Sequence, residues 1–97
     1  MTVRLLFLPR AQLDLEDIWD YSAAHWGTER AERYIRQLWQ HAEEIAAQPR
    51  LGQSCDGTRE GYRKYRAGSH VLFYRSGDGG IEIVRILHER MDYDQHL

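Results

Sequence analysis

The pattern of apolar and polar positions divides the chain into a short strand, two helices and three further strands. Residues 3–8 form a short apolar run closed by a proline, and a run of this length favours a strand. From Ala11 to Trp26, apolar and small residues recur with helical spacing, and Gly27 is the expected stop. A second helical pattern follows at once and ends near Ala47. So short a connection predicts an antiparallel helical hairpin.

Each predicted helix has one apolar face that can pack against a sheet. In the first helix this face comprises Ala11, Leu15, Ile18, Trp19, Ser22 and Trp26, and in the second Ala31, Ile35, Leu38, Ala42 and Ile45. The acidic residues of the first helix, including Asp14, fill much of its remaining surface and are expected to face solvent. Thr28 is expected to cap the second helix. Tyr21 and Trp39 lie outside both apolar faces, which favours either partial burial at the hairpin edge or contact with a partner.

The second half of the chain alternates as strands do. Residues 50–61 are expected to form a loop, and strands are expected over 62–67, 70–75 and 81–88, joined by glycine-containing turns. The order β-α-α-β-β-β predicts a single α+β domain over residues 1–97. Its helical hairpin should pack on one face of a mainly antiparallel sheet. The other face of the sheet is then expected to be either solvated or used for binding.

Strand alternation predicts which side chains share a face of the sheet. In the last strand the two sets are Glu82, Val84, Ile86 and His88, and Ile81, Ile83, Arg85 and Leu87; in the strand before it they are His70, Leu72 and Tyr74, and Val71, Phe73 and Arg75. Each face therefore mixes apolar side chains with charge. That mixture is typical of a binding surface, although an arginine can also pack its stem on the sheet while its head reaches water.

Charge is distributed unevenly along the chain. The net charge is −2, but residues 11–48 carry eight acids and three arginines, a balance of −5, whereas residues 59–90 carry seven bases and four acids, a balance of +3. This asymmetry suggests a polar binding face, although an ordinary solvated surface is the commoner cause. The single Cys55 fits a reducing compartment, and no apolar run approaches the roughly 18 residues of a membrane helix. A cytoplasmic protein without a membrane contact is expected.

The sequence offers little support for a metal or cofactor site. None of the five histidines lies three to five residues from another, and no glycine-rich loop opens a helix. We therefore expect neither a metal nor a cofactor. Metal-independent cleavage of nucleic acid would need an acid, a base and cations around a phosphate. The side chains that could supply these groups are Glu60, Arg63, Arg85, His88 and Tyr93.

Several segments together resemble the ParE branch of the RelE/ParE toxin family. They are "PRAQLDLEDIWDYSAAHWG", "AERYIRQLWQHAEEIAAQPRLG", "GYRKYRAGSHVLFYR" and, most specifically, "IEIVRILHERMD". The resemblance covers nearly the whole chain. It implies a helical hairpin on an antiparallel sheet and a toxin of a bacterial toxin–antitoxin pair. It also implies DNA gyrase as the target and a ParD-like antitoxin whose tail wraps the toxin, with no sequence-specific DNA binding by the toxin alone.

Two other functions are also compatible with the sequence. The RelE branch cleaves messenger RNA on the ribosome, and its members generally carry lysines and arginines on the sheet. This chain has one lysine, Lys64. The third possibility is a non-toxic member that acts only in a repressor complex. The net charge and the scarcity of lysine favour the gyrase inhibitor over the ribonuclease.

The resemblance implies no catalytic residue but suggests residues that contact the target or the antitoxin, namely Arg63, Arg85, His88, Arg90, Met91 and Asp92. Trp19 and Trp39 join this set because an antitoxin tail must cover apolar surface to bind tightly. The cluster from Arg85 onwards is expected to pack the end of the chain and to present charge to a partner, with Arg85 or Arg90 paired to a nearby acid. The antitoxin is expected between the helical hairpin and the open sheet edge, near Leu5, Phe7, Trp19 and Trp39.

Overall fold

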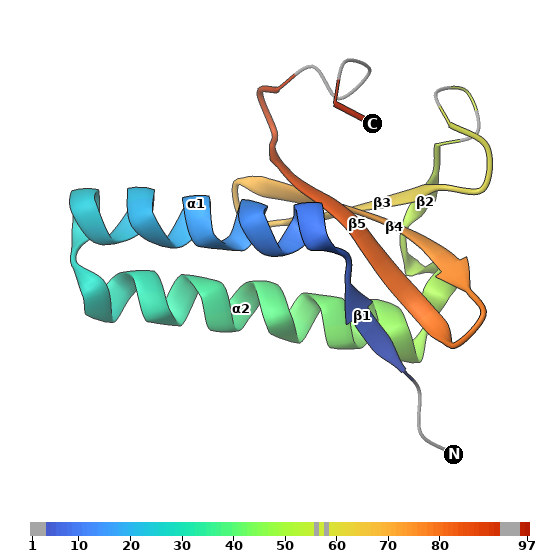
Figure 1. The fold of residues 1–97 in the computed structure, drawn as a ribbon, viewed down its shortest axis with the longest axis horizontal. Coiled ribbons are helices and arrows are strands. Elements are labelled where there is room, and N and C mark those ends of the chain that lie inside the picture. Colours follow the sequence, from blue (N-terminus) through green and yellow to red (C-terminus); the bar gives the residue numbers. More distant parts are fainter. Residues whose placement is uncertain (1–3, 56, 58, 92–95) are drawn as a thin grey trace.

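Two long helices lie across one face of a five-stranded sheet in the computed structural model, which describes residues 4–55, 57, 59–91 and 96–97 (Figure 1). The elements in chain order are β1 (Leu5–Phe7), α1 (Pro9–Trp26), α2 (Thr28–Ala47), the 3-10 helix η1 (Pro49–Leu51), β2 (Gln53–Ser54), β3 (Arg63–Ala67), β4 (His70–Gly77) and β5 (Gly80–His88). The predicted α+β architecture is confirmed. No helix in the described part of the chain is long and apolar enough to span a membrane.

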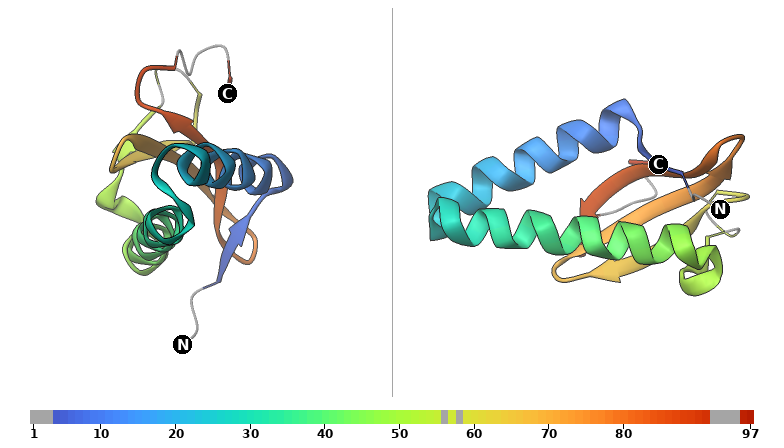
Figure 2. Two further views of the ribbon diagram at one scale, coloured as in Figure 1. Left: turned by 90° about the vertical axis from the view of Figure 1, so that its left-hand side faces the viewer. Right: turned by 90° about the horizontal axis from the view of Figure 1, so that it is seen from below.

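The strands follow the order β1-β5-β4-β3-β2 across the sheet. The pairs β2–β3, β3–β4 and β4–β5 are antiparallel, and β1 runs parallel to β5. The predicted loop over residues 50–61 was wrong in part, because η1 and the two-residue strand β2 lie within or overlap it. Figure 2 shows both helices on the same side of the sheet and the hairpin tip projecting beyond the strands.

The main core lies between the hairpin and the sheet. Its buried members are Ala11, Ile18, Leu38, Ala42, Ile45, Ala46, Ala67, Leu72, Tyr74, Ile81, Ile83 and Ile86. Leu15 and Ile35 pack against this set, and Ser22 and Ala31 are also buried, so most of both predicted helix faces is confirmed. Three details were wrong. Trp26 is 54% exposed, Asp14 is 6% exposed and therefore buried, and Thr28 makes no capping hydrogen bond. Gly27 stands at the cap position instead, with a φ of +90° that a residue with a side chain rarely adopts.

A β-bulge between β4 and β5 overturns the simple alternation predicted for the last strand. Phe73 pairs with Arg85, but the next residue, Tyr74, pairs with Ile83, so the register shifts by one residue. Ile83 and Ile86 both reach the main core as a result. The extra residue of a bulge reverses the facing of every side chain beyond it. The faces predicted for β4 itself agree with the structure, since Leu72 and Tyr74 reach the same core.

A second, smaller apolar cluster lies apart from the main core. It consists of Cys55, Phe73 and Leu87, with Tyr62, Val71 and Leu97 packed against it. The loop that carries Cys55 and the residue Leu97 therefore cover part of the sheet that was expected to be open. Leu97 is also tied to that loop, because Arg59 donates a hydrogen bond to its carbonyl oxygen.

Candidate functional site

The polar cluster at the end of β5 begins with a buried ion pair that joins β5 to α1. Arg85 Nε and Nη2 donate to the two carboxylate oxygens of Asp14 at 2.9 and 3.1 Å. Asp14 Oδ2 also accepts the Ile86 N–H at 2.9 Å. Among the described residues, β1 pairs with residues 81–83 of β5. Further along the same edge of β5, the Asp14 carboxylate accepts the backbone N–H of Ile86 in place of a neighbouring strand. The expected pairing of Arg85 with an acid is confirmed.

Arg85 also holds the end of the chain. Its Nη1 donates to the carbonyl oxygen of His96 at 2.9 Å, and its side chain is 10% exposed. The guanidinium therefore donates its hydrogen bonds to groups of the same chain, which gives Arg85 a structural role. Its contact with a target or an antitoxin stays a prediction.

His88 ends β5 beside a second histidine. The rings of His70 and His88, which are cross-strand partners, stand edge to face at 5.3 Å. The Tyr34 hydroxyl lies 2.6 Å from Nδ1 of His70 and accepts the Ser69 N–H at 3.0 Å. Burial, and to a smaller degree the neighbouring His88, lowers the pKa of His70 to about 4. His70 is therefore neutral at pH 7, and its Nδ1 can accept a hydrogen bond from the Tyr34 hydroxyl.

The residues after His88 form a turn on the surface. The N–H groups of Arg90 and Met91 donate to Nδ1 and to the carbonyl oxygen of His88 at 3.2 and 2.9 Å. Both side chains are exposed, that of Met91 by 39%. These two predicted contact residues are thus available to a partner. Asp92, the next in the predicted set, lies outside the described residues, as does Tyr93.

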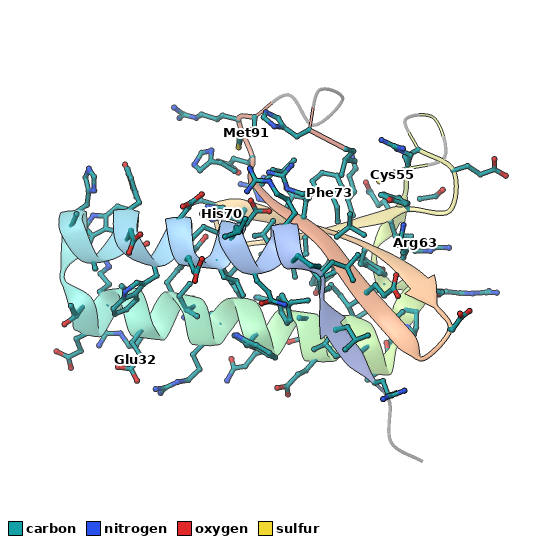
Figure 3. The ribbon with its side chains drawn as sticks, in the orientation of Figure 1. Glu32, Cys55, Arg63, His70, Phe73 and Met91 are labelled. Carbon is teal, nitrogen blue, oxygen red and sulfur yellow. The ribbon has the colours of Figure 1, made fainter. Side chains whose placement is uncertain are left out.

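The remaining predicted residues do not join this cluster. Arg63 lies at the start of β3, several residue pairs along the sheet from His88, and Figure 3 shows it well apart from Met91. Trp39 on α2 is 42% exposed and contacts Phe7 at a ring distance of 4.4 Å. Trp19 is half-buried on α1. The seven predicted contact residues that the structure describes therefore lie at several separate places, and their role in binding stays a prediction.

Every arginine on strands β3 to β5 has a partner within the chain. Arg63 donates to the Gly52 carbonyl oxygen at 2.7 Å, Arg66 pairs with Glu89, Arg75 pairs with Glu82 at 2.8 Å, and Arg85 pairs with Asp14. The hydrogen bond that Arg75 donates to the Glu82 carboxylate raises the pKa of the Arg75 guanidinium. Acids thus neutralise three of the four arginines that the sequence placed on a basic sheet.

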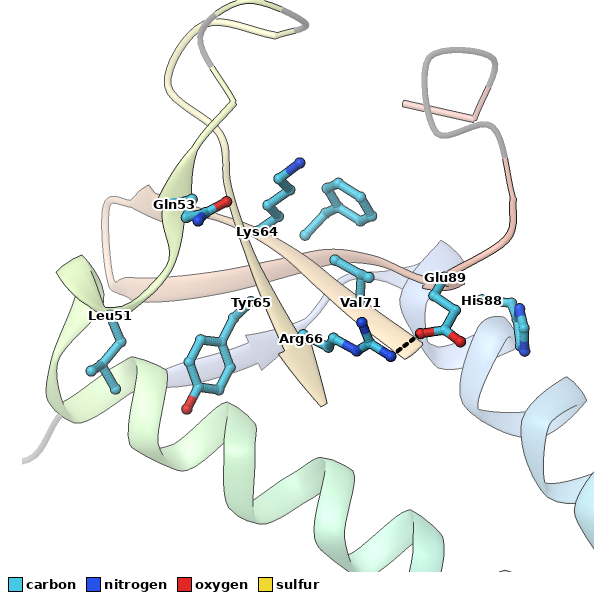
Figure 4. Close-up of a pocket in the computed structure, with 9 residues that line it drawn as sticks. Leu51, Gln53, Lys64, Tyr65, Arg66, Val71, His88 and Glu89 are labelled. Carbon is cyan, nitrogen blue, oxygen red and sulfur yellow. Dashed lines mark ion pairs between the residues drawn. The ribbon is translucent and has the colours of Figure 1, made fainter. Parts of the chain in front are cut away.

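Among the surface hollows lined by the described residues, two are candidate binding sites. The first, here called the sheet groove, has a volume of about 500 Å³ and lies over the β2–β3–β4 part of the sheet (Figure 4). It is lined by Leu51, Gln53, Lys64, Tyr65, Arg66, Val71, Phe73, His88 and Glu89. β2 pairs only with Arg63 and Lys64, so the edge of β3 from Tyr65 to Ala67 has no paired strand among the described residues.

The second hollow, the hairpin-tip groove, lies where the hairpin meets the β3–β4 turn. It consists of two adjoining cavities of about 430 and 380 Å³ that share Trp26, Tyr34 and Ser69. Asp17, Ile18, Tyr21, Ser22, His70 and His88 line the first cavity, and Arg30, Arg33 and Gln37 line the second. Sequence reasoning missed this site because it assigned Trp26 to the core. The signal was the aromatic cluster Tyr21, His25 and Trp26 just before Gly27.

The described residues contain no cluster of three or more histidine, cysteine, aspartate or glutamate side chains that could hold a metal. Both grooves present apolar, hydrogen-bonding and charged side chains, a combination typical of contact surfaces between macromolecules.

Comparison with known proteins identifies the family. The model for "ParE toxin of type II toxin-antitoxin system, parDE" matches residues 5–93. The chain belongs to the ParE toxin family of type II toxin–antitoxin systems. Toxin ParE1 of Mycobacterium tuberculosis H37Rv is 51% identical over 98 residues, covering 100% of both chains, and Toxin ParE1 of Caulobacter vibrioides is 48% identical over 88 residues, covering 91% of each. The resemblance to ParE toxins inferred from the sequence is confirmed.

Solved structures agree with the ParE fold. A chromosomal ParDE toxin–antitoxin system from P. aeruginosa contains a chain that superposes with a TM-score of 0.78 at 19% identity, covering 89% of this chain and 95% of that one. The YoeB–YefM complex from Staphylococcus aureus matches with a TM-score of 0.54 at 18% identity, covering 92% and 99%. At such identities the likeness establishes the shared fold of this ParE-family chain.

Proposed function

We propose that this ParE-family toxin blocks DNA gyrase by binding to it, and that a ParD-like antitoxin neutralises the toxin. Family membership supports the toxin role, and the fold likeness to the P. aeruginosa ParDE system supports an antitoxin partner. Because gyrase works on the chromosome, the proposal places the toxin in the cytoplasm.

The observation that carries the proposed binding mode is the internal pairing of the sheet arginines. A ribonuclease needs cations that face the phosphate and an acid–base pair beside them. Here Arg66, Arg75 and Arg85 are each bound to a carboxylate. The net charge of −2 adds repulsion towards RNA. Inhibition through protein contact is therefore better supported than cleavage of messenger RNA.

We infer that the antitoxin's tail binds along the open edge of β3. An extended segment can add to an unpaired strand edge through backbone hydrogen bonds, and pockets beside the edge then select its side chains. Tyr65–Ala67 supply such an edge, and the sheet groove lies next to it. The alternative at β1 is weaker, because Leu5 and Phe7 pack against the main core. Hydrogen exchange measures this directly: bound antitoxin should slow exchange of amides in Tyr65–Ala67.

The test of the target is a supercoiling assay with purified DNA gyrase, titrated with the toxin in the presence and absence of the antitoxin. We expect inhibition that the antitoxin reverses. Arg90→Ala and Met91→Ala should weaken inhibition if the end of β5 contacts gyrase, whereas Arg50→Ala, which alters an exposed arginine elsewhere, should not. The proposal would be overturned by a folded toxin that leaves the supercoiling activity of gyrase unchanged but cleaves messenger RNA on ribosomes.

A further inference from the structure

The tip of the helical hairpin carries an exposed group of aromatic rings. Tyr21 and Trp26 are 57% and 54% exposed. The Tyr21 ring stacks on His25 at 3.9 Å and meets Trp26 edge to face at 5.8 Å. These contacts hold the indole in a fixed place while leaving much of it open to water. Exposed but ordered aromatic rings are the usual anchors of protein interfaces, since little entropy is lost when a partner covers them.

The hairpin-tip groove continues from this aromatic group onto the sheet side. Ile18 and Tyr34 supply further apolar surface within it. In its lining, the Tyr34 hydroxyl is hydrogen-bonded both to the Ser69 N–H, from which it accepts, and to Nδ1 of His70. An occupant therefore need not supply hydrogen bonds to these groups, and its apolar atoms can rest on this part of the lining without leaving a buried polar atom unpaired.

Two arginines border the groove on the α2 side. The Arg30 guanidinium lies 5.5 Å from the centre of the Trp26 ring, and Arg33 follows one turn later. Neither has an acidic partner within the described part of the chain, whereas Arg36, one turn further along, is paired with Glu32 at 2.7 Å. Cations at the rim of an apolar hollow favour a ligand with negative charge beside an apolar group.

We propose that the hairpin-tip groove binds an acidic peptide segment of a protein partner, with an apolar side chain over Trp26 and Tyr34 and a carboxylate at Arg30 and Arg33. The rival occupant is single-stranded nucleic acid, whose bases stack on open aromatic faces. It fits less well, because Tyr21 is already stacked on His25, and because a strand carries phosphates along its whole length and so meets Asp17 in the first cavity, whereas a peptide can keep its carboxylate in the second cavity at Arg30 and Arg33. This inference stands apart from the gyrase proposal, since its test contains neither gyrase nor antitoxin.

The test uses a blocked octapeptide, GELFEDLG, and its neutral analogue GQLFQNLG, titrated into the isotopically labelled full chain. Two-dimensional NMR follows the indole N–H of Trp26 and the side-chain N–H of Arg30 and Arg33. We expect the acidic peptide to shift these signals to saturation and the neutral analogue to bind about three- to tenfold more weakly, as for the loss of a partly exposed charge contact. An oligothymidine of similar length serves as the nucleic-acid probe.

Matched variants separate the groove from general charge attraction. Arg33→Glu should weaken binding of the acidic peptide by about tenfold, because it replaces attraction with repulsion. Arg50→Glu makes the same change at an exposed residue outside the groove and should leave binding unchanged. Trp26→Ala should abolish saturation, and its exposed position predicts an unchanged fold, to be checked by the dispersion of the remaining signals.

Three results would overturn the inference. They are the absence of any saturable shift with the acidic peptide, equal binding by the neutral analogue or by the Arg33→Glu variant, and tighter binding of the oligothymidine than of the peptide. Each is read from a folded chain, so a loss of structure cannot be mistaken for a loss of the site.

Discussion

Asp14 connects segments that lie more than seventy residues apart in the chain, and its carboxylate is therefore the polar group whose loss should matter most. It binds the Arg85 guanidinium through both oxygens and also accepts the Ile86 N–H. Removing one member of a buried ion pair leaves the other charge in a poorly solvated place, which is usually more costly than the pair itself is stabilising. The pair thus fixes α1 against the edge of β5.

Asp14→Asn keeps the size of the side chain but removes its charge, so the free energy of unfolding should fall by about 3 kcal/mol. Urea titration followed by circular dichroism measures this change. Glu16→Gln makes the same chemical change at an exposed position of α1 and should stay within about 0.5 kcal/mol of the parent. An Asp14→Asn protein as stable as the Glu16→Gln control would show that the ion pair contributes nothing.

His70 predicts a dependence of stability on pH. Its pKa is lowered from 6.5 to about 4 in the folded chain, first by burial and then by His88. Between these values the unfolded chain binds the proton and the folded chain does not, so stability should fall as the pH drops from 6.5 towards 4. His70→Gln should reduce this loss by about 2 kcal/mol. Urea titrations at several pH values measure it, and parallel curves for parent and variant would refute it.

At the scale of elements, one tyrosine of β4 holds η1 and the residue before β2, in addition to the pairing of β2 with β3. The Tyr74 hydroxyl donates to the Pro49 carbonyl oxygen at 2.6 Å and accepts the Gly52 N–H at 2.8 Å. Burial raises the pKa of this hydroxyl, which therefore stays protonated and able to donate. Gly52 itself must lack a side chain, because an added Cβ would lie 2.4 Å from the Tyr74 oxygen and 2.7 Å from the Lys64 carbonyl oxygen.

Gly52→Ala should therefore push η1 and β2 away from the sheet and lower the free energy of unfolding by about 2 kcal/mol, as overpacking typically does. Thermal unfolding gives the change. Gly57→Ala is the control, because a Cβ there meets no described atom within 4 Å. Equal melting temperatures for the two variants would mean that the Tyr74 side chain moves away from the added Cβ at little cost in stability. In that case β2 is not held as the structure implies.

At the same scale, the sequence predicts the secondary-structure elements better than the surroundings of individual side chains. The helices and the three long strands were predictable, because their apolar periodicity is set by the core that each face meets. The bulge opposite Phe73 and Tyr74 was not, since strict alternation was assumed along β5 and no residue there marks where the register shifts. Asp14 was assigned to solvent by its charge alone, because its partner Arg85 is remote in sequence. Trp26 has helical core spacing, but α1 extends beyond the sheet that could cover it.

On the scale of the whole molecule, the sheet separates two apolar regions of very different size. The main core lies under the hairpin, whereas Cys55, Phe73 and Leu87 form a small cluster covered by Tyr62, Val71 and Leu97. The small cluster has three buried members, against twelve in the main core. Loosening only the partly buried residues that cover it should therefore leave the fold intact, so this cover can be tested separately from global stability.

Cys55 provides the means, since it is the single cysteine of the chain and is 6% exposed within this cluster. Leu97→Ala removes an apolar contact above the cluster and should increase the rate at which Ellman's reagent modifies the thiol, with little change in the melting temperature. His96→Ala is the control, because the hydrogen bond from Arg85 goes to the backbone oxygen of His96 and survives the substitution. A rate unchanged by Leu97→Ala would mean that other residues shield Cys55. A rate raised equally by both variants would mean that a general loosening of residues 96–97, and not the loss of the Leu97 contact, exposes Cys55.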